Sequence, residues 1–254
     1  QGHLGPLVAT SLGLEGAATA TVESACASGG VALQLAYTSV ASGHTDATLV
    51  VGVEKVSQVD SKTATTYFTY GSDVPFEAGC GATFPALYAT LATAYLHKYG
   101  ATEEQLAHVA VKNHKNALAN PNAHLHKAIT VEQVLKSPYV AWPLKFYDCC
   151  PFSDGAAAVL LVSEGLAKAW GVDGVEVIGS GRGGSAAQLS TRTSLVEIPG
   201  TRQAAAQAFS QARLGPKDID FAEVHDCFTI AEVLAVEDLG LVKKGKGAQA
   251  AVEG

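Results

Sequence analysis

The stretch Val22-Glu23-Ser24-Ala25-Cys26-Ala27-Ser28-Gly29-Gly30 lies between two segments of different hydrophobic pattern and decides the fold class. Residues 20–25 predict a short buried strand that ends at Cys26. Residues 27–42 suit a buried helix, and Gly43 stands where such a helix ends. Residues 48–53 are apolar and β-branched. A strand, a helix and a strand of these lengths predict a parallel pair with a crossover, and hence an α/β fold.

The rest of the chain repeats this order around a different middle section. Glycine and proline punctuate residues 57–150, where helices are expected at 86–99 and 102–116. We expect further strands at 155–162, 175–178 and 219–224, and further helices at 4–14, 201–213 and 229–239. The predicted domains are an N-terminal half at 1–56, an inserted loop domain at 57–150, a return strand at 151–165 and a partial C-terminal half at 166–254.

Composition excludes several function classes. With 254 residues, 48% of them hydrophobic and 16% charged, the chain can bury a large core and is not disordered. A net charge of −7 gives no general attraction for a nucleic-acid backbone, so no nucleic-acid partner is expected. Charged and small residues interrupt the apolar segments before the ~18 uninterrupted residues that a membrane span needs, so no membrane span is expected.

The five cysteines indicate a reducing compartment. Their number is odd and no CxxC pair occurs, which argues against a secreted disulfide framework. The chain also begins with Gln1 and contains no methionine, so we expect either a methionine-poor fragment or a sequence from which methionines are missing, in which case some spacings are too short.

Cys26 is the first candidate for catalysis. It lies where the predicted strand meets the first turn of a helix, and the positive end of that helix favours thiolate over thiol. Gly29 and Gly30 would let backbone and substrate approach closely. A small core cysteine is the structural alternative, and the surrounding sequence favours the nucleophile.

The second candidate is the string His225-Asp226-Cys227-Phe228, which follows the predicted strand 219–224 as Cys26 follows residues 20–25. Ligands of open α/β sheets bind beyond the carboxyl ends of strands, so we expect both clusters to face one cleft. A histidine can donate a hydrogen bond to an oxyanion, and a cysteine can move a proton. An aspartate that caps a helix, with incidental neighbours, is the alternative.

Gly179-Ser180-Gly181-Arg182-Gly183-Gly184 matches the glycine pattern of dinucleotide-binding loops and follows the predicted strand 175–178. No helical pattern opens at Gly184, however, and the next helix is expected only after Pro199. A flexible loop is therefore the favoured interpretation.

Two further strings contain possible metal ligands, His124-x-His126 and Cys149-Cys150. Neither has the paired spacing of a structural zinc site. We expect loop histidines and ordinary thiols, and no metal.

Several of these segments resemble one family. Residues 22–30, followed by Val50-Val51-Gly52-Val53-Glu54-Lys55, resemble the nucleophile segment of thiolases, and DCCPFSDGAAA at 148–158 resembles the segment that returns from their loop domain. Most thiolases carry Asn-Glu-Ala-Phe where this chain has His225-Asp226-Cys227-Phe228, which resembles the sterol-carrier-protein type and its archaeal and bacterial relatives. The resemblance implies a thiolase fold, with two repeated halves whose mainly parallel sheets sandwich buried helices, plus the loop domain.

The resemblance also implies roles. Cys26 would take an acyl group from coenzyme A as a thioester, His225 would contribute to an oxyanion hole, and Cys227 would move the proton of the α-carbon or of the departing thiol. The loop domain at 57–150 would hold the coenzyme A arm, and Val111-Lys112-Asn113-His114 matches a family string there. Coenzyme A thioesters are substrates, so no separate cofactor is expected.

The expected reaction is Claisen condensation of acyl-CoA with acetyl-CoA, or the thiolytic reverse. In the family a further strand–helix unit comes first, and a Gly-His-Pro string, whose histidine activates the nucleophile, follows the part that matches Gly254. Neither is present here, so we expect this chain alone not to be a competent enzyme. The alternatives are a thiolase-like scaffold or acyl-CoA carrier, and a dinucleotide-dependent oxidoreductase. A homodimer or homotetramer in the cytoplasm is expected, or in peroxisomes or mitochondria if the source is eukaryotic.

Overall fold

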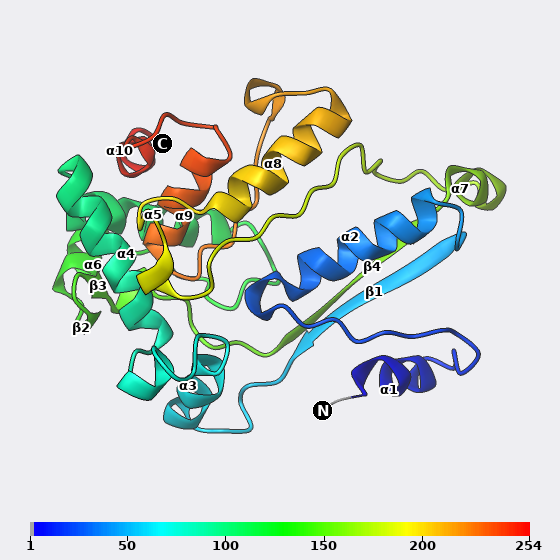
Figure 1. Cartoon of the computed structure of the whole chain (residues 1–254), viewed down its shortest axis with the longest axis horizontal. Coiled ribbons are helices and arrows are strands. Elements are labelled where there is room, and N and C mark those ends of the chain that lie inside the picture. Colours follow the sequence, from blue (N-terminus) through cyan, green and yellow to red (C-terminus); the bar gives the residue numbers. More distant parts are fainter. Residues whose placement is uncertain (1–2) are drawn as a thin grey trace. The chain divides into compact units, whose positions relative to one another are not determined.

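Helices dominate the computed structural model of the chain, which describes residues 3–254 (Figure 1). The helices are α1 Leu4–Ser11, α2 Ser28–Ala41, α3 Ser61–Thr69, α4 Phe84–Tyr99, α5 Glu103–Ala117, α6 Val131–Lys136, α7 Glu164–Trp170, α8 Pro199–Ala212, α9 Thr229–Asp238 and α10 Gly247–Glu253. The strands are β1 Ala47–Glu54, β2 Tyr139–Ala141, β3 Leu144–Lys145 and β4 Gly155–Val162. The chain divides into two compact units, the first up to Val53 with 156–177 and the second 54–155 with 178–254.

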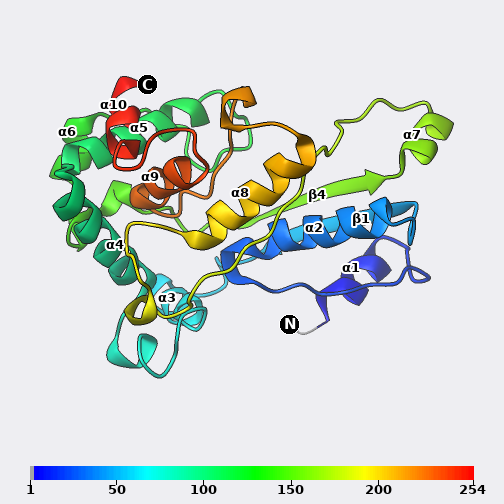
Figure 2. The same cartoon turned by 45° about the horizontal axis from the view of Figure 1, so that its top comes forward.

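The first unit is built on a two-stranded sheet of β1 and β4. The two strands run in opposite directions, with α2 along them (Figure 2). Just beyond the ends of the strands, the Ser163 N–H donates to the Asp46 carbonyl oxygen at 2.8 Å. Gly43 follows α2 with a φ of +72°, a left-handed conformation that glycine adopts without strain and that ends the helix.

The second unit is a helical assembly around α9. The side chains of α9 are mostly buried, and α4, α5, α8 and α10 pack against it (Figure 1). A helix that is buried on all sides must pair its charged residues internally. Glu237 and Asp238, whose side chains are fully buried, do so: Lys244 Nζ lies 3.4 Å from Glu237 Oε2 and 2.9 Å from Asp238 Oδ1. The Tyr95 hydroxyl of α4 also donates to Glu237.

Local capping signals place the helix starts of the second unit. Thr102 begins α5 with a capping box, in which its hydroxyl accepts from the Gln105 N–H while the Gln105 side chain accepts from the Thr102 N–H. Thr130 and Gln133 do the same for α6. The short strands β2 and β3 pair antiparallel after α6. In the described part of the chain, no helix is long and apolar enough to span a bilayer.

The sequence predicts the helices better than the strands. The expected helices at 27–42, 86–99, 102–116, 201–213 and 229–239 and the strands at 48–53 and 155–162 are confirmed within about two residues at each end. The strands expected at 20–25, 175–178 and 219–224 are wrong, because none of these segments forms a ladder among residues 3–254. An apolar extended run becomes a strand only beside a partner that supplies hydrogen bonds. The parallel pairing of 20–25 with 48–53 is therefore not formed.

Candidate active site

Cys26 lies in a 3₁₀ turn, Ala25–Ala27, that leads directly into α2. Three short hydrogen bonds hold this turn. The Ala25 N–H donates to Glu23 Oε1 at 2.6 Å, the Ser24 N–H donates to Ser28 Oγ at 2.7 Å, and the Ser28 hydroxyl donates to the Ala25 carbonyl oxygen at 2.7 Å. Cys26 is exposed, so the alternative of a buried core cysteine is wrong.

The backbone before Cys26 is strained. Ala25 has a φ of +47°, a left-handed conformation that costs a residue with a Cβ about 1–3 kcal/mol. The turn places Cys26 beside the first N–H groups of α2, a helix of 14 residues, whose positive end favours a thiolate. A Cβ on Gly29 or Gly30 would meet nothing within 4 Å, so these glycines leave open space next to the turn.

His225, Asp226, Cys227 and Phe228, which we call the HDCF turn, precede α9 in the second unit. Cys227 and Phe228 are buried, whereas His225 and Asp226 are exposed. Phe228 packs on the Tyr88 ring of α4 with the ring centroids 4.6 Å apart. The residue that caps α9 is Phe228, so the alternative of a capping aspartate is wrong.

Residues 148–150 hold the HDCF turn from one side. Cys149 forms an antiparallel β-bridge with Phe228, and the Cys150 N–H donates to the Cys227 carbonyl oxygen at 3.0 Å. Thr229, the first residue of α9, donates its hydroxyl to Asp148 Oδ1 at 2.8 Å. Residues 148–150 therefore fix both the backbone of the HDCF turn and the first residue of α9.

Burial raises the pKa values of two residues in segment 148–150, Asp148 and Cys149. Burial raises the pKa of Asp148, although hydrogen bonds from the Lys145 N–H and Thr229 oppose the shift. Burial, the Asp148 carboxylate and the thiols of Cys150 and Cys227 together raise the pKa of Cys149 to about 12. Cys149 is therefore protonated, and unreactive as a nucleophile, at neutral pH.

Helix α5 holds the other side of the HDCF turn. The Asn113 side-chain amide donates to Asp226 Oδ2 at 2.6 Å and to Glu232 Oε2 at 2.8 Å. Lys112 Nζ forms an ion pair with Glu232 Oε1 at 2.8 Å and donates to Asn113 Oδ1 at 2.6 Å. Sequence reasoning singled out the string 111–114 but did not assign these contacts.

A pocket of about 500 Å³ lies elsewhere in the second unit, lined by Val56, by residues of the predicted loop domain and by residues of the predicted return strand. Asp154 forms part of its wall and accepts hydrogen bonds from the Val56 N–H at 2.8 Å and the Ser57 N–H at 2.9 Å. Lys55 forms an ion pair with Asp154, and these donors hold the pKa of Asp154 well below its ordinary value. The residues that line the pocket are Val56, Ser57, Val59, Ser61, Ala64, Asn122, His124, Phe152 and Asp154.

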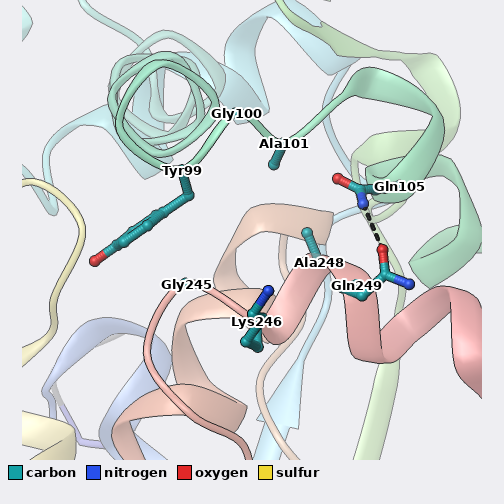
Figure 3. Close-up of a pocket in the computed structure, with 8 residues that line it drawn as sticks. All are labelled: Tyr99, Gly100, Ala101, Gln105, Gly245, Lys246, Ala248 and Gln249. Carbon is teal, nitrogen blue, oxygen red and sulfur yellow. Dashed lines mark hydrogen bonds between the residues drawn. The ribbon is translucent and has the colours of Figure 1, made fainter.

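A smaller pocket, about 140 Å³, lies between the α4–α5 junction and the start of α10 (Figure 3). Gln105 of α5 donates to Gln249 of α10 at 2.9 Å on one side of it. On another side Gly245 approaches the Tyr99 ring so closely that a Cβ would lie 2.6 Å from it. None of the predicted catalytic residues lines this pocket.

Two family models match the chain. One, described as the thiolase N-terminal domain, matches residues 6–165, and the other, described as thiolase C-terminal domain-like, matches residues 181–254. Together they cover both candidate clusters. The chain belongs to the thiolase family. The predicted family and the thiolase fold are confirmed.

The curated relatives of this thiolase chain include both types that its HDCF string resembles, an archaeal protein and a sterol carrier protein. Acetyl-CoA acetyltransferase of Methanothermobacter thermautotrophicus is 45% identical over 254 residues, which are 100% of this chain and 66% of the relative. Sterol carrier protein 2 of Gallus gallus is 31% identical over 247 residues, which are 92% of this chain and 45% of the relative. The chain therefore spans two thirds or less of the length of these relatives.

A solved structure with a similar fold is the Ltp2-ChsH2(DUF35) aldolase. It is 29% identical to this thiolase chain with a TM-score of 0.73, and the match covers 89% of this chain and 60% of the other. Cys26 and the HDCF turn belong to different compact units of the chain. The prediction that both face one cleft stays a prediction.

The glycine-rich string of this thiolase is a packing motif. A Cβ on Gly179, Gly181 or Gly183 would lie 2.0–2.4 Å from a carbonyl oxygen of α8. The N–H group of the residue after each of these glycines donates to a glutamine side chain of the same helix: Ser180 to Gln211 at 3.0 Å, Arg182 to Gln207 at 3.1 Å and Gly184 to Gln203 at 3.2 Å. These N–H groups point at α8, and no helix begins at Gly184, so the string lacks the features of a phosphate-binding loop.

The two loop histidines bind protein groups. His124 Nδ1 lies 2.6 Å from Ser153 Oγ, and His126 Nε2 lies 2.6 Å from the Asn120 carbonyl oxygen. Within residues 3–254, no group of three or more histidine, cysteine, aspartate or glutamate side chains is arranged to hold a metal ion.

Proposed function

We propose that this chain carries the nucleophile and a proton-transfer group of an acyltransferase that acts on coenzyme A thioesters. The observation that carries the proposal is the exposed Cys26, held by a strained turn at the N-terminus of α2. That position favours the thiolate and also an oxyanion that forms next to it. The name of the Methanothermobacter relative, acetyl-CoA acetyltransferase, supports the same chemistry.

In the first half-reaction, the Cys26 sulfur attacks the carbonyl carbon of an acyl-CoA. The carbon–sulfur bond to coenzyme A breaks, and coenzyme A leaves as a thiol after taking up one proton. One thioester replaces another, so the step is nearly balanced in energy, and the protein mainly supplies a good nucleophile and oxyanion donors.

In the second half-reaction, an acetyl-CoA loses a proton from its α-carbon, and the resulting enolate attacks the acyl carbon on Cys26. The new carbon–carbon bond releases the Cys26 thiolate. We assign removal of the α-carbon proton to Cys227. We assign to His225 the donation of a hydrogen bond to the thioester oxygen. The exposed imidazole and the buried thiol of the HDCF turn suit these two tasks, because residues 148–150 and Asn113 hold the turn in place.

The pocket beside Asp154 is the proposed contact for part of the coenzyme A substrate. Its volume lies within the range of small-molecule sites, roughly 300–1,000 Å³. Its wall includes the polar residues Ser61, Asn122 and His124 beside apolar residues. A histidine-to-alanine change at position 124 is expected to raise KM for coenzyme A while leaving kcat nearly unchanged.

Thiolysis of acetoacetyl-CoA by the full-length protein tests the proposal. Acetyl-CoA is quantified by chromatography for the wild type, for C26A and for C80A, which removes another exposed cysteine. C26A is expected to lose at least about a thousandfold in rate, and C80A to stay near wild type. Turnover that survives in C26A would refute the assigned nucleophile.

The scaffold or carrier alternative differs in one observable property. A carrier binds acyl-CoA but forms no acetyl-CoA from acetoacetyl-CoA and coenzyme A, whereas the proposed enzyme does both.

The homodimer or homotetramer and the cytoplasmic location stay predictions. Analytical ultracentrifugation tests the first, and cell fractionation tests the second.

A further inference from the structure

The three cysteines around the HDCF turn have a defined register. Cys149 pairs with Phe228 in the antiparallel bridge, so the next residue along one segment, Cys150, lies opposite the preceding residue of the other, Cys227. The hydrogen bond from the Cys150 N–H to the Cys227 carbonyl oxygen, 3.0 Å long, confirms that register.

Residues directly opposite each other on antiparallel segments project to the same face. A hydrogen-bonded pair of this kind has its Cα atoms about 5.5 Å apart and its Cβ atoms about 4.5–5.5 Å apart. A disulfide requires Cα atoms roughly 4.4–6.8 Å apart. The backbone therefore already brings Cys150 and Cys227 to a bridging separation, and a small shift of the Cβ atoms completes the geometry.

The environments of the three thiols differ in a way that sets an order of reaction. Cys150 is exposed, Cys227 is buried next to it, and Cys149 is half-buried with a pKa raised to about 12. An oxidant from solvent reaches Cys150 first. Cys149 is adjacent in sequence but stays protonated, so it competes poorly.

We propose that Cys150 and Cys227 are a reversible oxidation site that closes to a disulfide in the presence of a hydroperoxide. The Cys150 sulfur takes one oxygen from hydrogen peroxide, the O–O bond breaks, and one water leaves. The Cys227 sulfur then attacks the resulting sulfenic acid, the sulfur–sulfur bond forms and a second water leaves. The two sulfurs are oxidised and the peroxide is reduced, and a thiol such as glutathione reverses the change.

The consequence for catalysis rests on the proposed function. A disulfide removes the Cys227 thiol that we assign to proton transfer, so carbon–carbon bond chemistry stops while the bond persists. In a reducing compartment such a bond is transient, as expected of a regulatory thiol pair.

Peptide mapping of the full-length protein tests the site without relying on turnover. The protein is treated with hydrogen peroxide, remaining thiols are blocked with N-ethylmaleimide, and a tryptic digest is analysed by mass spectrometry. Cleavage after Lys145 and Lys217 places Cys149 and Cys150 in peptide 146–168 and Cys227 in peptide 218–243. The expected product joins these peptides, with the mass of the sum less the two thiol hydrogens, and dithiothreitol separates them.

Two variants locate the bond. C149S is expected to keep the cross-link, and C150S to lose it by at least about tenfold. A cross-link that survives in C150S, or a Cys150 that is oxidised to sulfinic acid in every sample without joining Cys227, overturns the proposal. Failure of this site leaves acyl transfer by the reduced protein intact, whereas failure of the proposed function leaves the cross-link intact, so the two are distinguished.

Discussion

Asn113 of α5 donates a 2.6 Å hydrogen bond to Asp226, the second residue of the HDCF turn, and a 2.8 Å bond to the buried Glu232 one turn into α9. One amide thus bridges the turn and the helix that follows it. The carboxylates of Asp226 and Glu232 would repel each other without hydrogen-bond donors, and the Asn113 amide supplies a donor to each. Asn113 is therefore a positioning residue for His225 and Cys227.

Replacing Asn113 with aspartate should damage the turn. The variant removes both donors and adds a third carboxylate, so the free energy of unfolding should fall by about 1–3 kcal/mol. The rate of carbon–carbon bond chemistry should fall about tenfold or more, while acyl loading of Cys26 changes little. Denaturant unfolding and single-turnover kinetics measure the two effects.

The matched control for this change is N116D, an exposed position on the same helix. It adds the same charge without touching the HDCF turn. Equal losses in N113D and N116D would mean that the added charge on α5, and not the contact with Asp226, is responsible.

The two adjacent cysteines 149 and 150 should differ sharply in alkylation. A rise from 9.0 to about 12 in the pKa of Cys149 lowers its thiolate fraction at pH 8 about a thousandfold. Iodoacetamide at pH 8 should therefore label Cys150 long before Cys149, as followed by tandem mass spectrometry. Labelling of Cys149 at a similar rate would show that the thiol is neither buried nor electrostatically shielded.

The contacts of Asp154 with Lys55 and Ser57, beside the larger pocket, should persist at acid pH. The pKa of Asp154 is lowered in the folded state, first by Lys55 and then by the Ser57 hydroxyl and N–H. A depressed folded-state pKa gives stabilisation that is complete above the ordinary value of 3.8 and declines as the pH falls from there through the folded pKa. A carboxyl NMR titration should place the midpoint of Asp154 below 3.8.

The variant K55Q supplies the check on that titration. It removes the largest cause of the shift, so the midpoint of Asp154 should move up toward its ordinary value. An unchanged midpoint would leave Lys55 without the role assigned to it.

The buried end of α9 depends on a tyrosine hydroxyl. Tyr95 is fully buried and donates to Glu237, and burial and that contact raise the pKa of the Tyr95 hydroxyl far above its ordinary value. Y95F leaves the Glu237 carboxylate without this donor and should lower the free energy of unfolding by about 1–3 kcal/mol. Y99F, whose ring packs against Tyr95, is the control and should change it much less.

The helices follow from local signals that are complete in the sequence. Thr102 with Gln105 and Thr130 with Gln133 form capping boxes, and Gly43 ends α2 as expected. The strands depend on partners far away in sequence. Residues 20–25 and 219–224 have the right composition but no ladder among residues 3–254, which apolar pattern alone does not reveal.

Candidate residues could be singled out where they stand in a short string, and their contacts could not be predicted where those contacts depend on packing. Cys26 and the HDCF turn could be singled out from their strings, and the glycine string 179–184 could be set aside because no helix follows it. The contacts of Asn113 with Asp226 and of Asp148 with Thr229 could not be predicted, since each joins residues about 80–115 positions apart that only the packing of the second unit brings together.

The most direct test of the central claim is the mass of the full-length protein after incubation with acetyl-CoA, followed by peptide mapping. The account predicts one added acetyl group, carried as a thioester on the tryptic peptide that contains Cys26 and ends at Lys55, absent in C26A and retained in C227A. An acetyl group found on another residue, or one that persists in C26A, would contradict it.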